Sequence, residues 1–305
     1  MTAAGRPGPV IQPSDFKRAV ARFQDDEMSR WAAALTYYSL LSLFPALLFG
    51  VAVLGFFGQQ ALVTDVAGYL KDVGAPPEVI DGVTGALQSA QGQRETAAGA
   101  LVLGLATSLY GASGAFGAAG AALNHVWRVE EGRGFVGRKL GNLLWTIVVL
   151  ALVLVTSVLV FLGGSLAEDV LGLIGLGESI SDVWSIVRWP AALLAAALIY
   201  AIVYYAAPNV EVRRWQYITP GAVFGVLAWI VASAGFFLYV SELARFPATY
   251  GAFATVVILL IWLYLTNLVL LFGAELNAVI DVRRSPDLPP GYDGAVLPTK
   301  DPAEP

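Results

Sequence analysis

Apolar residues along this chain gather into six long runs, separated by polar segments rich in glycine and proline. The runs cover residues 31–57, 97–125, 143–165, 186–207, 217–240 and 250–274. Each reaches the length of about 20 residues that an α-helix needs to cross the ~30 Å hydrocarbon core of a bilayer. The pattern therefore predicts an all-α, polytopic membrane protein with six transmembrane helices.

The segment before the first run has helical periodicity of its own. Its apolar positions are Phe16, Val20 and Phe23, and the basic positions opposite them are Lys17, Arg18 and Arg22. This spacing predicts an amphipathic helix at the membrane surface, while a solvated lead-in to the first span is an equal alternative. The expected organisation is a disordered N-terminus (1–13), an interfacial helix (14–30), a six-helix transmembrane domain (31–282) and a disordered C-terminal tail (283–305).

Basic residues are concentrated on one side of the predicted membrane. With the N-terminus inside, all but four of the 18 Lys and Arg residues lie in cytoplasmic segments; the four are Lys71, Arg94, Arg188 and Arg245. Because cytoplasmic loops carry an excess of Lys and Arg, both termini are predicted to face the cytoplasm. This orientation is compatible with two inverted three-helix halves. The repeat signal, Tyr110-Gly111-Ala112 against Tyr250-Gly251-Ala252, is short enough to arise by chance.

The composition is typical of a membrane protein and excludes several kinds of reactive or metal-binding site. Hydrophobic residues make up 57% of the chain and charged residues only 13%, about half the charged share of an average soluble domain. The chain has no cysteine, which excludes disulfides, thiolate metal sites and cysteine nucleophiles. It also lacks a GxxxxGK[ST] phosphate-binding loop, so transport driven by its own ATP hydrolysis is not expected.

Polar residues within the spans are few, and each is a functional candidate because burying such groups in a membrane is costly. Most fall at the cytoplasmic ends of spans 1, 2 and 6, with one about two turns deeper in span 6; the set is Tyr37, Tyr38, Asn124, His125, Asn267 and Glu275. We expect a polar cluster there, in which Glu275 points into the bundle and pairs with one of the residues of span 1 or span 2, closing the cytoplasmic side of a pathway. The alternative is an ordinary interfacial belt, with Glu275 among the headgroups beside Arg283 or Arg284.

Glycines and prolines also interrupt the spans. Span 2 carries glycines at short intervals, among them Gly111, Gly114, Gly117 and Gly120. Because small residues let neighbouring helices approach closely, we expect this span to be a central packing helix and a surface for oligomer formation. A pliable helix lining a pathway is the alternative. Pro45 in span 1 and Pro220 early in span 5 are expected to kink their helices, since proline removes a backbone hydrogen bond.

Three segments resemble one known family. Residues 32–45, AAALTYYSLLSLFP, are similar to the first-span signature of the YihY/BrkB family. Leu123-Asn124-His125-Val126-Trp127 resembles that family's Leu-Asn-x-x-Trp at the end of span 2, and residues 250–278 are similar to its last span. The resemblance covers roughly residues 15–282 and implies a multi-pass protein of the bacterial cytoplasmic (inner) membrane. Proteins of this family have also carried two older names, ribonuclease BN and a virulence factor linked to serum resistance.

The ribonuclease label does not fit the residues of this chain. Metal-dependent phosphodiester hydrolysis needs several convergent carboxylates or histidines, and the chain has one histidine and no cytoplasmic cluster with ligand spacing. We therefore expect no enzyme activity, cofactor, metal site or nucleic-acid partner. The favoured interpretation is a transporter or lipid-handling permease of unidentified substrate, in contact with membrane lipids. The alternative is a non-transporting membrane scaffold or envelope-integrity factor.

The topology makes a direct prediction. A reporter active only in the cytoplasm is expected to work when fused after basic residues of the inner segments and to fail in the outer loops, because the charge bias fixes orientation. The expected active fusions follow Arg30, Arg138, Arg214 and Arg284, and the expected inactive ones lie near Asp81, Asp182 and Glu242. Reporter activity at Asp81 would mean that the orientation is reversed.

Overall fold

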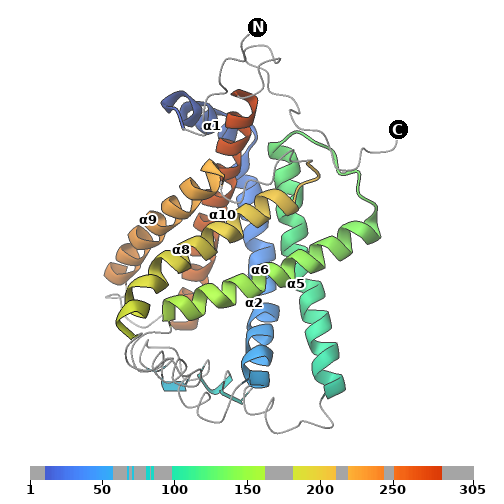
Figure 1. Ribbon diagram of the computed structural model, residues 1–305, viewed down its shortest axis with the longest axis vertical. Coiled ribbons are helices and arrows are strands. Elements are labelled where there is room, and N and C mark those ends of the chain that lie inside the picture. The colour runs from blue at the N-terminus through green and yellow to red at the C-terminus, as the bar shows by residue number, and fades with distance from the viewer. Residues whose placement is uncertain are drawn as a thin grey trace. The chain divides into compact units, whose positions relative to one another are not determined.

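The computed structural model describes residues 11–57, 67–68, 71, 80–82, 84–85, 98–161, 181–210, 219–243 and 251–283. Its long helices are α1 (Pro13–Asp25), α2 (Met28–Phe57), α5 (Ala98–Val126), α6 (Phe135–Phe161), α8 (Ser181–Ala206), α9 (Pro220–Leu243) and α10 (Gly251–Arg283) (Figure 1). No β-strand occurs in the described residues, so the predicted all-α class is confirmed. Both terminal segments were expected to be disordered. Residues 1–10 and 284–305 of these segments lie outside the described part.

Each of the six predicted runs overlaps one long helix of the described part, namely α2, α5, α6, α8, α9 or α10. Within the described residues, four stretches are long and apolar enough to cross a membrane: Phe135–Val160, Ile186–Ala206, Pro220–Val240 and Val256–Arg283. Their mean hydropathy lies between 2.0 and 2.8. The chain is therefore a helical membrane protein with several apolar helices able to span the bilayer.

Apolar side chains on these helices point outward as well as inward. On α6, Leu140 is 62% exposed and Leu144 is 59% exposed; on α9, Val231 and Phe237 are more than 70% exposed. A soluble monomer rarely shows contiguous apolar surface on this scale. Such surface is favourable where lipid tails replace water as the solvent.

The N-terminal amphipathic segment breaks earlier than the predicted end at residue 30. The α1 helix starts at Pro13, and the Gln12 backbone N–H donates to the Asp15 carboxylate at 2.9 Å, which satisfies one of the free donors of the first turn. It ends at Asp25, and α2 begins at Met28. Glu27 in the connecting turn has a φ of 51°, a left-handed conformation that interrupts the helix between α1 and α2.

The chain divides into two compact units. One combines residues 1–38 with 116–305, and the other comprises residues 39–115. The second unit holds Gly111, which is exposed, and Gly114, where an added Cβ would meet nothing within 4 Å. Pro45 also lies there within α2, but its side chain is outside the described part. The first unit contains a buried core, formed by α8, α10, the end of α5 and the starts of α2 and α9.

Helices α9 and α10 approach closely at their ends near Gly221 and Gly273. A Cβ added at Gly221 would overlap the Gly273 carbonyl oxygen, and one at Gly273 would lie 2.5 Å from the Tyr204 hydroxyl of α8. Asn277 of α10 accepts a hydrogen bond from the Gly221 N–H at 2.8 Å and donates to the Thr219 hydroxyl at 2.9 Å. Small residues bring the two backbones together, and the asparagine amide connects them with hydrogen bonds.

The structure corrects the expected kink at Pro220. This proline is the first residue of α9, a position at which its missing N–H would have no partner within the helix. Thr219 caps the helix, because its hydroxyl accepts a hydrogen bond from the Ala222 N–H at 3.1 Å. Pro220 therefore starts α9 and does not bend it. Pro190, by contrast, lies inside α8.

Two of the span 2 glycines lie at contacts within the first unit. A Cβ at Gly117 would lie 2.8 Å from the Asn142 Nδ2 atom of α6, and one at Gly120 would lie 2.7 Å from the Ala207 carbonyl oxygen that follows α8. The Ala207 contact is with backbone, which has little freedom to move away. Gly120 thus holds α5 against the end of α8.

We expect Gly221→Ala to destabilise the protein, because its methyl group has no room beside α10. Overpacking of this kind typically costs about 1–3 kcal/mol. Gly235→Ala in the same helix is the matched control, since an added Cβ there meets nothing within 4 Å and alanine favours a helix by roughly 0.5–1 kcal/mol over glycine. Thermal unfolding of the detergent-solubilised variants measures both effects. Equal melting temperatures for the two variants would contradict the close approach.

Candidate functional site

The candidate site is built around Glu275, near the end of α10. Its side chain has no exposed surface, and its neighbours Ala274 and Leu276 are also fully buried. The Arg22 Nε atom of α1 lies 3.1 Å from the Glu275 Oε2 atom. A buried carboxylate next to a single guanidinium forms an ion pair whose loss would leave an uncompensated charge inside the protein.

Arg22 connects Glu275 to the end of α5. Its NH2 atom donates to the Val126 carbonyl oxygen at 2.7 Å and lies 3.9 Å from the Asp26 Oδ2 atom. The other Asp26 oxygen accepts a hydrogen bond from Arg128 at 2.8 Å. We call Arg22, Asp26, Arg128 and Glu275 the charge network. It joins α1, the α1–α2 turn, the segment after α5, and α10.

Backbone geometry places Arg128 in this network. It follows the last residue of α5 by two positions and has a φ of 53°. Its N–H donates to the His125 carbonyl oxygen and the next N–H, of Val129, donates to the Asn124 carbonyl oxygen, so the turn closes the end of α5. Non-glycine residues in the left-handed region are uncommon. Within the described residues only two have this geometry, and both adjoin or belong to the charge network.

A second ion pair fixes the other end of α1. The Asp15 Oδ1 atom lies 3.0 Å from the Arg283 Nε atom, and the Asp15 side chain is fully buried. Between the two ion pairs, Ala19 packs with Leu276 and Ile280 of α10. Helix α1 therefore runs antiparallel to the last turns of α10 and is held by a charge pair at each end, with an apolar contact in the middle.

This arrangement corrects the predicted orientation of α1. Arg22 was assigned to the polar face, yet its side chain is only 15% exposed. Phe16, which was assigned to the apolar face, is 42% exposed, and its ring lies 5.3 Å from that of Phe272 and 5.7 Å from that of Phe224. The buried stripe is Asp15, Ala19, Arg22 and Asp26, with side chains spaced four, three and four residues apart. That spacing marks one face of a helix.

The structure places the residues of the predicted polar cluster at separate positions. Tyr37 and Tyr38 are 60% and 41% exposed and contact each other edge to face. His125 is exposed and lies against the Trp31 ring at 5.6 Å. Asn267 is buried, and its amide donates to the Thr36 hydroxyl at 3.3 Å.

Glu275 does point into the protein, as expected. Its ion partner is Arg22 of α1, however, and not the expected residue of span 1 or span 2. The end of α5 contributes to the network through the Val126 carbonyl group, by way of Arg22. The predicted partner is therefore corrected, because an arginine from the interfacial helix supplies the positive charge that a carboxylate needs when it is buried.

Asn124 belongs to a second polar cluster, at the end of α8. Its Oδ1 atom accepts a hydrogen bond from the Asn209 N–H at 2.6 Å, and its amide donates to Glu131 at 3.3 Å. Arg133 makes a two-pronged contact with the Glu131 carboxylate at 2.7 Å and also donates to the Ala207 carbonyl oxygen at 2.8 Å. Burial alone would raise the pKa of Glu131, but the hydrogen bonds and charge of Arg133 outweigh it and lower that pKa below its ordinary value.

Several of these residues were not among the candidates drawn from the sequence. They are Asp15, Arg22, Asp26, Arg128, Glu131, Arg133, Asn209, Asn277 and Arg283. The periodicity of α1 contained a signal for three of them, since Asp15, Arg22 and Asp26 share a stripe with Ala19. No comparable pattern marks Glu131 or Arg133, which lie in a basic loop where positive charge is expected for topological reasons.

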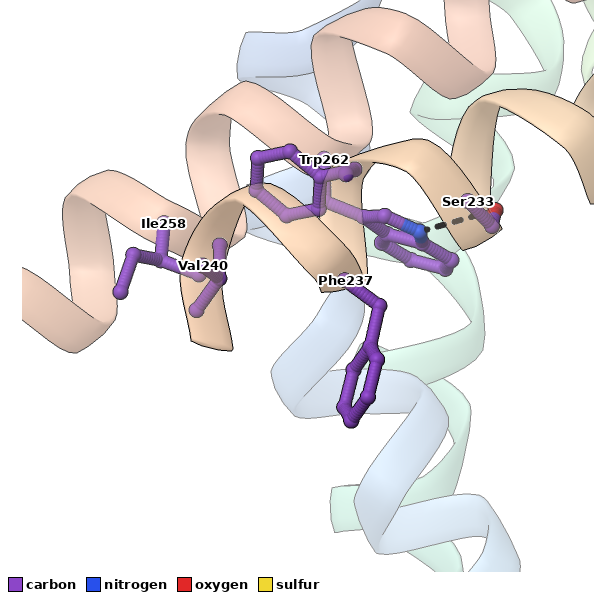
Figure 2. A pocket seen from close by; sticks show the side chains of 6 residues that line it. Ser233, Phe237, Val240, Ile258 and Trp262 are labelled. Carbon is purple, nitrogen blue, oxygen red and sulfur yellow. Dashed lines mark hydrogen bonds between the residues drawn. The ribbon is translucent and has the colours of Figure 1, made fainter. Parts of the chain in front are cut away.

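An apolar groove lies farther along α9 and α10 (Figure 2). Its lining residues are Ser233, Phe236, Phe237, Val240, Ile258 and Trp262. The Trp262 indole N–H donates to the Ser233 hydroxyl at 3.3 Å, so the polar atoms of the lining are occupied with each other. The groove offers aromatic and aliphatic surface, which suits a hydrocarbon chain better than a polar solute. Among the described residues no group of three His, Cys, Asp or Glu side chains is placed to hold a metal ion.

The buried pair makes a stability prediction. Arg22→Ala is expected to cost about 3–5 kcal/mol, because it leaves Glu275 charged and buried without a cation. Arg30→Ala is the control, since Arg30 pairs with Glu27 on the surface and exposed pairs contribute only ~0–1 kcal/mol. The double variant Arg22→Met with Glu275→Leu should recover part of the loss. Thermal unfolding in detergent measures all three, and equal losses for Arg22→Ala and Arg30→Ala would contradict the buried ion pair.

Sequence comparisons agree with this architecture. The ribonuclease-like protein YfkH of Bacillus subtilis is 31% identical over 89% of this chain and 96% of its own length. UPF0761 membrane proteins of Rhodospirillum centenum and Pseudoalteromonas translucida are 29% and 28% identical, and the chain spans 56% of the former and 89% of the latter. No solved structure matches the chain. The profile of the family described as virulence factor BrkB matches residues 19–293, so the chain belongs to that family, the YihY/BrkB family that its spans resemble.

Proposed function

We propose that this membrane protein is a transporter or lipid-handling permease whose moving parts meet at the charge network. The observation that carries the proposal is the complete burial of Glu275, within an apolar helix long enough to span the bilayer. Ionisable residues within membrane helices are rare because they are costly, and they commonly mark pathways for ions or substrates. We further propose six spans, with both termini in the cytoplasm of a bacterium and the protein in the inner membrane.

A lipid is the substrate class that the surface of the protein favours. The groove between α9 and α10 is lined mainly by apolar side chains, and Phe237 at its edge is 72% exposed. Lys17 and Arg18 are exposed on α1. A basic amphipathic helix attracts anionic headgroups, while an apolar groove accepts acyl chains. Together the two features suit an amphiphile with a negatively charged head.

A non-transporting scaffold is the second candidate, and close packing favours it. Backbone contacts at Gly221 and Gly120 leave no space for another atom at these positions. Glu275 is enclosed by the protein and has no exposed surface. A protein whose helices stay in this arrangement would hold its neighbours together without opening a route through itself.

Reconstitution into liposomes separates the two functions. We expect the purified protein to accelerate the exchange of fluorescent phospholipids between leaflets, and Glu275→Gln to slow that exchange about tenfold or more, equivalent to at least ~1.4 kcal/mol on the barrier. Glu27→Gln is the control, because Glu27 is exposed and pairs with Arg30 outside the network. A parallel assay follows uptake of small charged solutes. A folded protein that moves neither lipid nor solute faster than empty liposomes would favour the scaffold.

A further inference from the structure

Helix α1 covers one face of the last turns of α10 and is joined to it by two ion pairs. Asp15 lies 3.0 Å from Arg283, and Arg22 lies 3.1 Å from Glu275. Seven steps along α1 therefore match eight steps along α10, a length of about 10–12 Å at the rise of an α-helix. Both carboxylates are fully buried. Because each has its arginine on the other helix, both lose that cation if α1 leaves.

Little apolar surface holds α1 in place between these ion pairs. Ala19 is the residue of α1 that is buried in the apolar cluster beside the end of α10. Its side chain is a single methyl group, and apolar burial stabilises a contact in proportion to the area removed from water. Phe16 and Val20 are 42% and 36% exposed, and Phe23 is half-buried. The apolar contribution to this contact is therefore small for a helix of this length.

The ion pairs do not compensate for the small apolar contact. A buried ion pair gains attraction but loses the hydration of both charges, so its net contribution to a contact is often close to zero. The contact of α9 with α10 is of another kind. There the Gly221 backbone meets the Gly273 backbone, and Asn277 connects the two helices with hydrogen bonds. Of these two neighbours of α10, α1 is the one that can separate at lower cost.

Water can reach the end of α10 at which α1 is docked. The apolar stretch Val256–Arg283 has 28 residues, which as a helix is about 42 Å long and exceeds the ~30 Å hydrocarbon core of a bilayer. Glu275, Asp281 and Arg283 all lie in its last turns. Since charged residues are costly within hydrocarbon, this is the end that extends toward water. Charges released by α1 can therefore be hydrated there.

The turn between α1 and α2 can act as a hinge. Helix α1 ends at Asp25, α2 begins at Met28, and Glu27 between them is in the left-handed conformation. Asp26 in the same turn pairs with Arg128 at 2.8 Å, which anchors the turn to the segment after α5. Hinges are commonly a few residues at the ends of elements, where backbone angles change without disturbing the helices themselves. Helix α1 can therefore move while α2 stays in place.

We propose that α1 is a hinged strap, which alternates between a docked position on α10 and a released position. In the docked position, Arg22 and Arg283 neutralise the buried carboxylates of Glu275 and Asp15. In the released position, these four side chains are hydrated and the face of α10 that includes Val279 is open to water. The use of this movement as a gate rests on the proposed transport function, but the movement itself does not.

The chain has no cysteine, so single introduced cysteines report on the strap directly. Val279 and Ala278 are adjacent on α10 and each is 3% exposed. Val279 belongs to the cluster that contains Ala19, whereas Ala278 belongs to the core shared with α8. We expect a water-soluble maleimide to label Val279→Cys about tenfold faster or more than Ala278→Cys, because local opening exposes only the face under α1. Equal labelling rates would overturn the proposal.

Removal of one ion pair should shift the strap toward the released position. Arg283→Ala leaves Asp15 without its cation in the docked position, while in the released position Asp15 is hydrated. We therefore expect labelling of Val279→Cys to rise by about tenfold or more, with no change for Ala278→Cys. Arg30→Ala is the control, since it removes a surface pair with Glu27, and it should alter neither rate. A folded Arg283→Ala protein that labels Val279→Cys at the original rate would contradict the strap.

Spin labels at exposed positions detect release while all the buried contacts are intact. Gln24 is exposed on α1, and Leu227 is 57% exposed on α9. We expect the distances between labels at Gln24→Cys and Leu227→Cys to form two populations, of which the released one grows in Arg283→Ala. A single population that Arg283→Ala does not change would rule out the movement. Release found in a protein that moves neither lipid nor solute would leave the strap intact and count against the transport function alone.

Discussion

Glu275 has no contact with water, and its neighbourhood is organised by the need to balance that charge. A buried carboxylate without a partner is strongly destabilising. Arg22 meets this need at 3.1 Å, which requires α1 to lie against α10. The turn after α1 and the end of α5 both contact Arg22, through Asp26 and the Val126 carbonyl oxygen, and Arg128 pairs with Asp26. One buried charge in a membrane helix thus determines where a surface helix docks.

The remaining polar contacts of the first unit also join elements that are distant in sequence. Asn277 connects the start of α9 to α10, and the Glu131–Arg133 pair connects the loop after α5 to the end of α8. These contacts lie where helices end, because helix ends carry backbone groups that need partners outside the helix. Between the ends, small residues and aromatic rings make the contacts. Polar contacts at the helix ends and apolar contacts between those ends together determine which helices of the bundle are neighbours.

The proposed functions use this division in different ways. A permease needs a contact between helices that can break and form again. The proposed place for such a contact is the junction of α1 and α10, because the charged side chains of the network meet there. A scaffold needs contacts that persist, which the backbone approach of Gly221 to α10 provides. The apolar groove that Trp262 lines is formed by side chains of α9 and α10 and includes no residue of the charge network.

The amino-acid sequence by itself determined the helical elements and the family, because a membrane helix must satisfy its backbone internally and shows this as a long apolar run. It also indicated that Glu275 turns inward, since a carboxylate in such a run is costly elsewhere. Only the tertiary structure decided that Arg22 is the partner, that α1 buries the stripe of Asp15 and Ala19, and that Tyr37 and His125 stay apart from Glu275. Periodicity tells which residues share a face of a helix. Which face meets which neighbour depends on charges and packing surfaces contributed by segments far away in the chain.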